Sequence, residues 1–312
     1  MSLQTPSTHR LRPGVAAVCL VASTLGGCEC EQRSLEHGGL SRTYLLHLPD
    51  PRPEVPPPLV LALHGRLGTA AGQRRTTGYN ALADRDGVVV AYPDGVDRSW
   101  ADARDVSPAH QQGVDDESFL LALIDAIDEE IAIDRDRIGM MGISNGGFMT
   151  QTMACKHGAL LAGAAAVVAT IPENLRDACA PAVPLSVLFM NGTEDPLVPF
   201  EGGTVDSDVG GEVLSFDDAV ATWVVHDRCD ASPTTTHVDE VDDDTAIRHD
   251  HYPGCASGTA VEAYAVEGGG HTWPGGGQYL PEGTVGRVST ELEGTELIWN
   301  FLLAQRRAAS FE

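Results

Sequence analysis

Hydrophobic residues along this chain form short uninterrupted runs that are separated by amphipathic stretches. The runs at 59–63 and 88–91 lack alternation, which is typical of strands covered on both faces. Between them, the stretch 76–85 predicts a helix that Gly87 ends. This succession of strand, helix and strand predicts a mostly parallel sheet of the α/β class, with helices on both faces.

The same patterns predict the remaining elements. Further strands are expected at 41–48, 138–141, 161–169, 186–190 and 261–266, and a hairpin at 234–239 and 246–252. Helices are expected near 117–131, after Gly146 to about His157, at 216–228 and at 290–306. Prolines at 49–58 predict an extended connector. The stretch 98–113 has no periodicity, which predicts a long surface loop. We expect a single domain over 41–307, without repeats or membrane spans.

The first 27 residues have the pattern of an export signal. Arg10 and Arg12 precede an apolar run at 15–25 that is too short to span a bilayer. Residues 25–28 resemble a bacterial lipobox, which predicts that Cys28 becomes the lipidated first residue of the mature protein. Ordinary cleavage near Gly27 is the alternative. Either way we expect an extracellular or periplasmic protein, with a flexible segment at 28–40.

Charge limits the partners of this protein. The formal net charge of -25 argues against nucleic-acid binding, which needs clustered Lys and Arg, and Lys156 is the only lysine. An acidic surface of this kind suggests a protein that is kept soluble by its charge in saline surroundings. The alternative is that the composition only reflects a GC-rich genome. We expect a monomer that meets a membrane only through the lipid anchor.

The seven cysteines fit an exported protein, in which thiols tend to pair. Cys155 with Cys179, and Cys229 with Cys255, each bracket one compact unit, although sequence alone does not fix connectivity. Cys30 is then left over. No CxxC or HExxH pattern suggests a metal site.

Three candidate reactive groups follow successive strands. Ser144 lies in Gly-Ile-Ser-Asn-Gly at 142–146, between a strand and a helix, which predicts a sharp turn that presents the hydroxyl. Asp195 follows a later strand, with Glu194 as its rival, and His271 follows the last strand in a glycine-rich loop. This order suits a nucleophile, a carboxylate that orients the imidazole, and a histidine base.

An attacked carbonyl also needs donors for its negative oxygen. The backbone N–H groups of Asn145, directly after Ser144, and of Arg66, after His64-Gly65, are the candidates. Trp100 and Trp273 are candidate walls of a substrate cleft, with buried packing as the alternative. His64 is a further cleft candidate, expected to be structural in the loop that holds Arg66.

Together these motifs resemble the polyhydroxybutyrate depolymerase and feruloyl esterase group of exported α/β-hydrolases. The resemblance covers about 41–306 and rests on the motifs at 63–65, 142–147, 191–199 and 269–276, of which the histidine block is the most specific. It implies an α/β-hydrolase fold and a serine esterase that needs no metal or organic cofactor. It also supports the two cysteine pairs.

The resemblance implies hydrolysis of hydroxyalkanoate oligomers or related esters. Depolymerases that attack solid polyester commonly carry a linker and a separate substrate-binding domain, and we expect neither after Arg306. Soluble oligomers and small esters, including feruloylated or acetylated sugars, are therefore at least as credible as solid polymer. Three alternatives stay open: a feruloyl or acetyl xylan esterase, a peptidase like prolyl oligopeptidase, and a non-catalytic lipoprotein that binds glycans or a surface partner.

Overall fold

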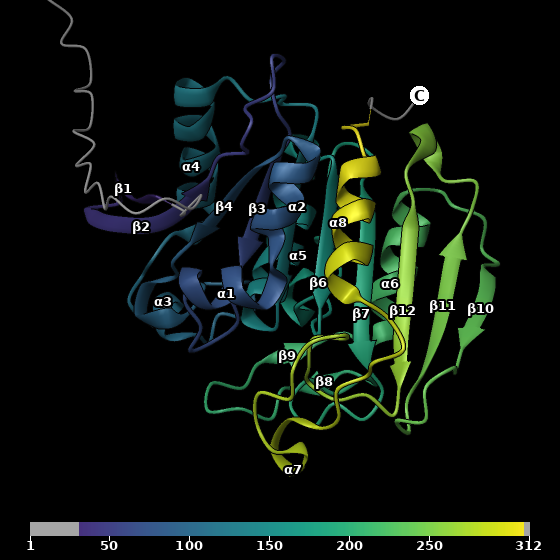
Figure 1. Ribbon diagram of the computed structural model, residues 1–312. Coiled ribbons are helices and arrows are strands. Elements are labelled where there is room, and N and C mark those ends of the chain that lie inside the picture. Colours follow the sequence, from purple (N-terminus) through teal and green to yellow (C-terminus); the bar gives the residue numbers. More distant parts are fainter. Residues whose placement is uncertain (1–30, 309–312) are drawn as a thin grey trace, which may run out of the picture.

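A ten-stranded sheet forms the centre of the computed structural model, which describes residues 31–308 (Figure 1). Across the sheet lie β1 (Glu31–His37), β2 (Leu40–His47), β4 (Val89–Pro93), β3 (Leu59–Leu63), β5 (Ile138–Ile143), β6 (Gly163–Val167), β7 (Ser186–Gly192), β12 (Val261–Glu267), β11 (Ala246–Tyr252) and β10 (Thr234–Val238). The six strands from β4 to β12 are parallel, and the two outer strands at each side are antiparallel. The predicted α/β class is confirmed.

Helices cover both faces of this sheet (Figure 1). They are α1 (Ala70–Thr77), α2 (Tyr79–Asp86), α3 (Pro108–Gln111), α4 (Asp116–Ile131), α5 (Asn145–His157), α6 (Phe216–His226), α7 (Glu282–Val285) and α8 (Gly294–Ala304), with short 3-10 turns at Val96–Arg98, Gly158–Leu160, Glu173–Leu175 and Ala256–Gly258. Helices α4, α5 and α6 pack in one apolar cluster, and α1, α2 and α8 in a second.

The strand β3 shows why its sequence does not alternate. Leu59, Leu61 and Leu63 belong to the first cluster, whereas Val60 and Ala62 belong to the second. Both faces of the strand are therefore buried under helices, as the uninterrupted run predicts.

The predicted helix at 76–85 is wrong in its bounds. The structure has two helices, α1 and α2, which meet at Gly78 with φ 60. Glycine adopts this left-handed conformation without the Cβ penalty, so it ends one helix and begins the next.

Two segments expected to be mobile or exposed are ordered parts of the fold. Within 28–40, residues Glu31–His37 form β1 and pair antiparallel with β2. The prediction of a flexible segment is therefore wrong for these residues. The predicted surface loop at 98–113 is partly buried, because Trp100, Asp102 and Arg104 lie inside the molecule, whereas residues 110–113 are exposed. Apart from the short helix α3, its backbone is irregular and held by side chains, which explains the missing periodicity.

Disulfides join Cys155 to Cys179 and Cys229 to Cys255, the two pairs expected from the sequence. The first links the last turn of α5 to the segment after β6. The predicted signal, Cys28 and Cys30 lie outside the described residues. Among the helices of residues 31–308, none is long and apolar enough to cross a membrane.

Candidate active site

The candidate nucleophile occupies a strained turn. Ser144 stands between β5 and α5 with φ 54 and ψ -122, a conformation that persists only where the surroundings enforce it. A Cβ built on Gly142 would lie 2.1 Å from the carbonyl oxygen of Gly146, so the turn closes only with glycine there. The strain and the missing side chain together hold Ser144 at the carboxyl end of the sheet, as the motif predicts.

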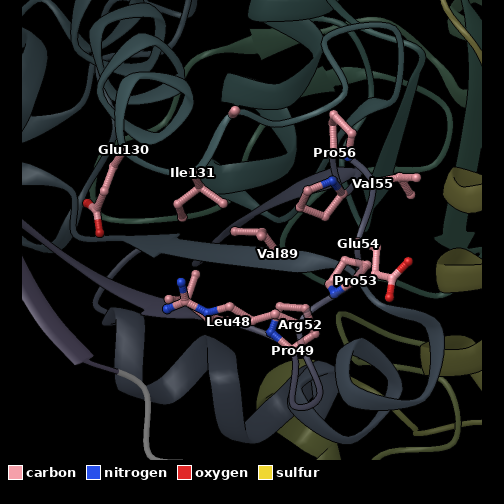
Figure 2. Close-up of a pocket in the computed structure, with 12 residues that line it drawn as sticks. Leu48, Pro49, Arg52, Pro53, Glu54, Val55, Pro56, Val89, Glu130 and Ile131 are labelled. Atoms are coloured by element: carbon pink, nitrogen blue, oxygen red, sulfur yellow. The ribbon is translucent and has the colours of Figure 1, made fainter.

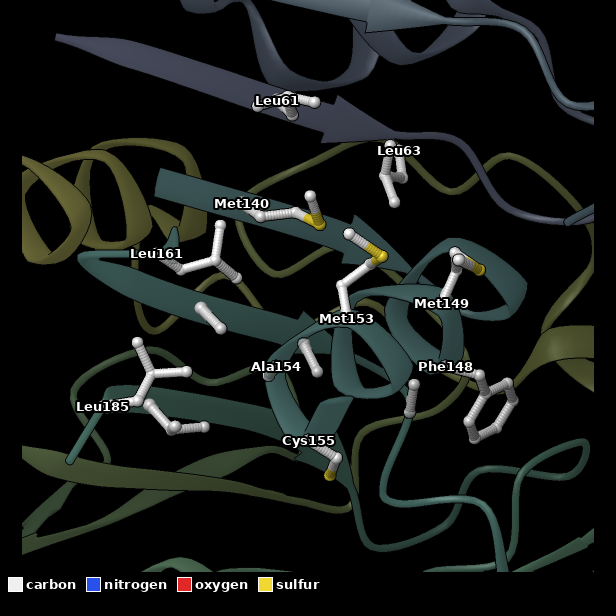
Figure 3. Close-up of a cluster of buried hydrophobic side chains, with 14 of the residues drawn as sticks. Leu61, Leu63, Met140, Phe148, Met149, Met153, Ala154, Cys155, Leu161 and Leu185 are labelled. Atoms are coloured by element: carbon white, nitrogen blue, oxygen red, sulfur yellow. The ribbon is translucent and has the colours of Figure 1, made fainter. Parts of the chain in front are cut away.

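Helix α5, which follows the turn, packs against the strands β3 and β5. Figure 3 shows Met149 and Met153 of α5 directed toward Leu63 of β3 and Met140 of β5. All four side chains are buried in the first apolar cluster. Because the helix packs on the two strands that carry the candidate groups, Ser144 and the loop after β3 keep a fixed relation.

The two candidate oxyanion donors flank Ser144. A Cβ built on Gly65 would lie 3.4 Å from the Cβ of Ser144, which places the loop after β3 against the turn. Within residues 31–308, neither the N–H of Arg66 nor that of Asn145 donates to a protein acceptor. Both N–H groups are therefore available to a substrate oxygen.

The structure brings His271 and Asp195 together. The Nδ1 of His271 lies 2.7 Å from Oδ2 of Asp195, and both side chains are buried. The second carboxylate oxygen accepts from the N–H groups of Leu197 and Val198 at 2.8 and 2.9 Å. Asp195, and not its rival Glu194, is thus the carboxylate in contact with the imidazole.

Sheet topology places this pair and Ser144 at the same edge of the sheet. Asp195 follows β7 and His271 follows β12, while Ser144 follows β5, so all three lie at the carboxyl edge of parallel strands. Among the hydrogen bonds of residues 31–308, none joins Ser144 to His271. Contacts of this kind often tighten only when substrate binds.

Glycines and Tyr279 hold the histidine loop. A Cβ built on Gly192 would lie 2.3 Å from the carbonyl oxygen of Gly269, so the loop packs directly on the end of β7. The O–H of Tyr279 donates to the carbonyl oxygen of His271 at 3.1 Å. Burial and the nearby charge of Asp195 raise the pKa of Tyr279 to about 12, so this donor keeps its proton at neutral pH.

His64 and Trp100 are both buried. The N–H of Gly95 donates to Nε2 of His64 at 2.9 Å, and Nδ1 lies 2.7 Å from the carbonyl oxygen of Gly65. Burial lowers the pKa of His64, which favours the neutral ring that this pattern requires. The structural role expected for His64 agrees with these contacts.

Trp100 supports both donor loops. Its Nε1–H donates to the carbonyl oxygen of His64 at 2.8 Å, and its backbone N–H donates to Oδ1 of Asn145 at 2.8 Å. Trp273 is also buried, with its Nε1–H on Thr295 at 3.2 Å. All three cleft candidates are therefore buried in this structure, which is the alternative stated for Trp100 and Trp273.

Sequence reasoning missed a buried ion pair behind Asn145. Asp102 accepts from Nδ2 of Asn145 at 2.6 Å and from Nη2 of Arg104 at 2.8 Å. Arg104 also lies over the ring of Phe148, 4.0 Å from its centroid. The sequence signal for this network was weak: Asp102 and Arg104 are two opposite charges in the stretch 98–113, which has no periodicity.

A hollow of about 280 Å³ lies at the opposite end of the sheet (Figure 2). It is lined by the proline-rich connector 48–57, Val89 at the start of β4, and residues 130–132 at the end of α4. None of the candidate groups borders it, so it is separate from the site. In the described part of the chain, no group of three His, Cys, Asp or Glu side chains could hold a metal ion.

Comparison with known proteins gives the chain its relatives. It is 31% identical to "Putative esterase NocK" of Nocardia uniformis subsp. tsuyamanensis over 285 residues, which are 87% of this chain and 82% of the relative. It is 27% identical to "Feruloyl esterase B" of Piromyces equi, over 69% of this chain and 39% of the relative. "Poly(3-hydroxyalkanoate) depolymerase C" of Paucimonas lemoignei is 30% identical over 35% of this chain and 27% of its own length.

The sequence pattern of the Prolyl oligopeptidase family matches residues 79–196. An acetyl xylan esterase from Aspergillus awamori has a similar fold, with a TM-score of 0.56 at 14% identity over 84% of this chain and 93% of that structure. The fold, the nearly full-length match to NocK and the strained serine turn lead to one conclusion. This chain belongs to the esterase group of the α/β-hydrolases, and it is a serine esterase that hydrolyses carboxylic esters.

Proposed function

We propose that Ser144, His271 and Asp195 form the catalytic triad of this esterase, and that the backbone N–H groups of Arg66 and Asn145 form its oxyanion hole. The 2.7 Å contact between His271 and the buried carboxylate of Asp195 carries the proposal. It leaves Nε2 of His271 as the ring nitrogen that can accept a proton. The strained conformation of Ser144 supports its role as nucleophile.

The mechanism follows from these positions. Nε2 of His271 takes the proton from Ser144 as the hydroxyl oxygen attacks the ester carbonyl, and Asp195 stabilises the resulting imidazolium. The two N–H groups hold the negative oxygen of the tetrahedral intermediate. His271 returns the proton to the leaving alcohol, which leaves an acyl-enzyme. Water then repeats the attack, and the acid is released as Ser144 recovers its proton.

For the substrate, we propose ester groups carried by plant polysaccharide, with feruloyl esters first and acetyl xylan second. The match to the relative named feruloyl esterase covers 69% of this chain, against 35% for the relative named depolymerase. This reverses the order expected from the sequence motifs, which put hydroxyalkanoate oligomers first. Tyr279 is 55% exposed beside His271, where its aromatic ring can stack against a ferulate ring or a sugar.

A peptidase is the second candidate, because the Prolyl oligopeptidase family pattern matches residues 79–196. That stretch includes Ser144 and Asp195 but not His271. The same three groups could cleave an amide, which is a harder bond with a poorer leaving group. Comparing ester and peptide substrates on one preparation separates the two activities.

The experiment is a substrate panel with purified protein: methyl ferulate, acetylated xylan, 3-hydroxybutyrate oligomers and a proline-containing peptide amide. We expect methyl ferulate to be hydrolysed fastest. Ser144→Ala should abolish turnover and covalent labelling by a fluorophosphonate, whereas Ser34→Ala, exposed on β1, should keep both. Full activity of Ser144→Ala would refute the nucleophile, and preference for the oligomers or the peptide would refute the proposed substrate.

We also propose that the protein works outside the cytoplasm. Its two disulfides are bonds of an oxidising compartment. Lipid attachment at Cys28 stays a prediction from the sequence. Expression of the full chain and of Cys28→Ala, followed by separation of membranes from medium, tests it: only the unaltered chain should stay with the membranes.

A further inference from the structure

The hairpin formed by β8 (Gly203–Thr204) and β9 (Glu212–Val213) ends in a loop at 207–211, here called the tip loop. This hairpin lies beyond the carboxyl ends of the central strands, on the same side as the site (Figure 1). It follows Asp195 in the chain. The tip loop has polar contacts with Arg66, a proposed oxyanion donor, and with Arg104, which is linked through Asp102 to the other proposed donor, Asn145.

The first contact is made by Asp208. Its carboxylate accepts from Nε of Arg66 at 3.1 Å and, through its other oxygen, from Nη2 of the same guanidinium. The Arg66 side chain is only 19% exposed, so this paired geometry fixes the residue whose backbone N–H is a proposed oxyanion donor. The bond to Asp208 raises the pKa of Arg66, and the bond to Arg66 lowers the pKa of Asp208, so both stay charged.

The second contact is made by Gly210. Its carbonyl oxygen accepts from Nη1 of Arg104 at 3.1 Å, and Arg104 is paired with Asp102, which accepts from Asn145. A Cβ built on Gly211 would lie 3.0 Å from the Cβ of Arg104, so the loop packs closely on this side chain. A continuous chain of hydrogen bonds therefore runs from the tip loop to the side chain of Asn145.

We propose that the tip loop is a clamp that sets the position of both oxyanion donors. Asp208 holds Arg66 directly, and Gly210 holds Asn145 through Arg104 and Asp102. This inference rests on the proposed function of Ser144, Arg66 and Asn145. Asp208 is then a positioning residue, because it acts through Arg66 and touches no reacting atom. Its loss should weaken transition-state stabilisation more than ground-state binding.

The test compares Asp208→Asn with Asp208→Glu, which keeps the charge, and with Asp206→Asn. Asp206→Asn is the matched control because it removes the same charge from an exposed position beside the loop, where the side chain has no hydrogen bond or ion pair within residues 31–308. We expect Asp208→Asn to lower kcat for a p-nitrophenyl ester by on the order of tenfold, with KM changed less than about twofold. Asp208→Glu should recover most of kcat, and Asp206→Asn should retain it.

Salt and stability give independent readouts. Because Asp208 is exposed, about 1 M NaCl should lower kcat of the unaltered enzyme toward that of Asp208→Asn and leave the variant unchanged. The melting temperature should shift by about 3 °C or less, since exposed ion pairs contribute little to stability. If kcat of Asp208→Asn stays within twofold, or falls equally in Asp206→Asn, the clamp is refuted.

Hydrogen exchange separates this inference from the proposed function. Peptides that contain Arg66 should exchange faster in Asp208→Asn than in the unaltered protein, whether or not Ser144 is the nucleophile. Unchanged exchange there would refute the clamp. An unreactive Ser144 with faster exchange would refute the proposed triad and keep the structural contact.

Discussion

The indole Nε1–H of Trp100 donates to the carbonyl oxygen of His64 at 2.8 Å, inside the molecule. This bond joins the loop after β4 to the loop after β3, and it lies two residues before the proposed donor Arg66. The backbone of Trp100 is bonded at the same time to the side chain of Asn145. One buried tryptophan therefore contacts both sides of the proposed oxyanion hole.

Trp100→Phe should slow catalysis by on the order of tenfold. The substitution keeps an aromatic ring but leaves the carbonyl of His64 buried without its donor, which costs about 1–3 kcal/mol. The loop that carries Arg66 should then lose its fixed position, and donors that are misplaced stabilise the oxyanion less well. Steady-state kinetics on a p-nitrophenyl ester and urea unfolding measure the two effects.

Trp223→Phe is the control for this change. Trp223 is equally buried, and its Nε1–H donates to Gln151 at 3.0 Å in the packing of α6 on α5. It should lose similar stability while kcat stays within about twofold. Equal losses of kcat in the two variants would mean that the Trp100 effect is general loosening of the fold.

A second prediction concerns the buried pair of Asp102 and Arg104, whose side chains are 1% and 2% exposed. Arg104→Met should destabilise the protein by about 3–5 kcal/mol, because it leaves the carboxylate of Asp102 buried without its cation. The double variant Asp102→Asn with Arg104→Met removes both charges, so it should be more stable than Arg104→Met alone. Urea unfolding of the set checks this, and a double variant less stable than that single one contradicts it.

The central part of the fold could be predicted because its signals are local. The run Leu59–Leu63 is continuous since both of its faces are buried, and the glycines around Ser144 are needed where a strand and a helix nearly touch. Candidates at strand ends share one edge of a parallel sheet by topology alone. For that reason the proposed triad residues could be named without coordinates. The two cysteine pairs were expected on a different ground, because each pair brackets one compact unit.

The support of the site could not be predicted, because it depends on tertiary partners. Nothing in the sequence near Asp102 states that Asn145 and Arg104 will share its carboxylate, or that Asp208 will meet Arg66 142 residues away. Burial of Trp100 likewise follows from packing against distant loops. The strand β1 was missed because its exposed face is polar, and pairing with β2 decides its structure.

A third prediction concerns the two disulfides, which close loops with sequence separations of 24 and 26 residues. Replacing either pair with alanines should lower the free energy of unfolding by about 3 kcal/mol, since cross-links of this span restrict the unfolded chain to a similar extent. Urea unfolding of Cys155→Ala with Cys179→Ala, and of Cys229→Ala with Cys255→Ala, measures it. A pair whose removal costs nothing would show that its loop is already restricted in the unfolded state.

The last prediction is a fall in stability above pH 6.5 that depends on His226. Burial disfavours its charge, but the carboxylate of Asp227, 2.6 Å from Nδ1, and the carbonyl oxygen of Pro181, 2.8 Å from Nε2, outweigh it and raise the pKa of His226. A raised folded pKa means that the folded state binds the proton more tightly. The resulting stabilisation is fully present below pH 6.5, the pKa of an unfolded histidine, and is lost as pH rises through the folded pKa.

Urea unfolding at pH 6, 7 and 8 should show this decline in the free energy of unfolding. The variant His226→Gln should be less stable than the unaltered protein at pH 6, and its stability should decline less as pH rises. An unchanged pH profile in His226→Gln would assign the dependence to another group.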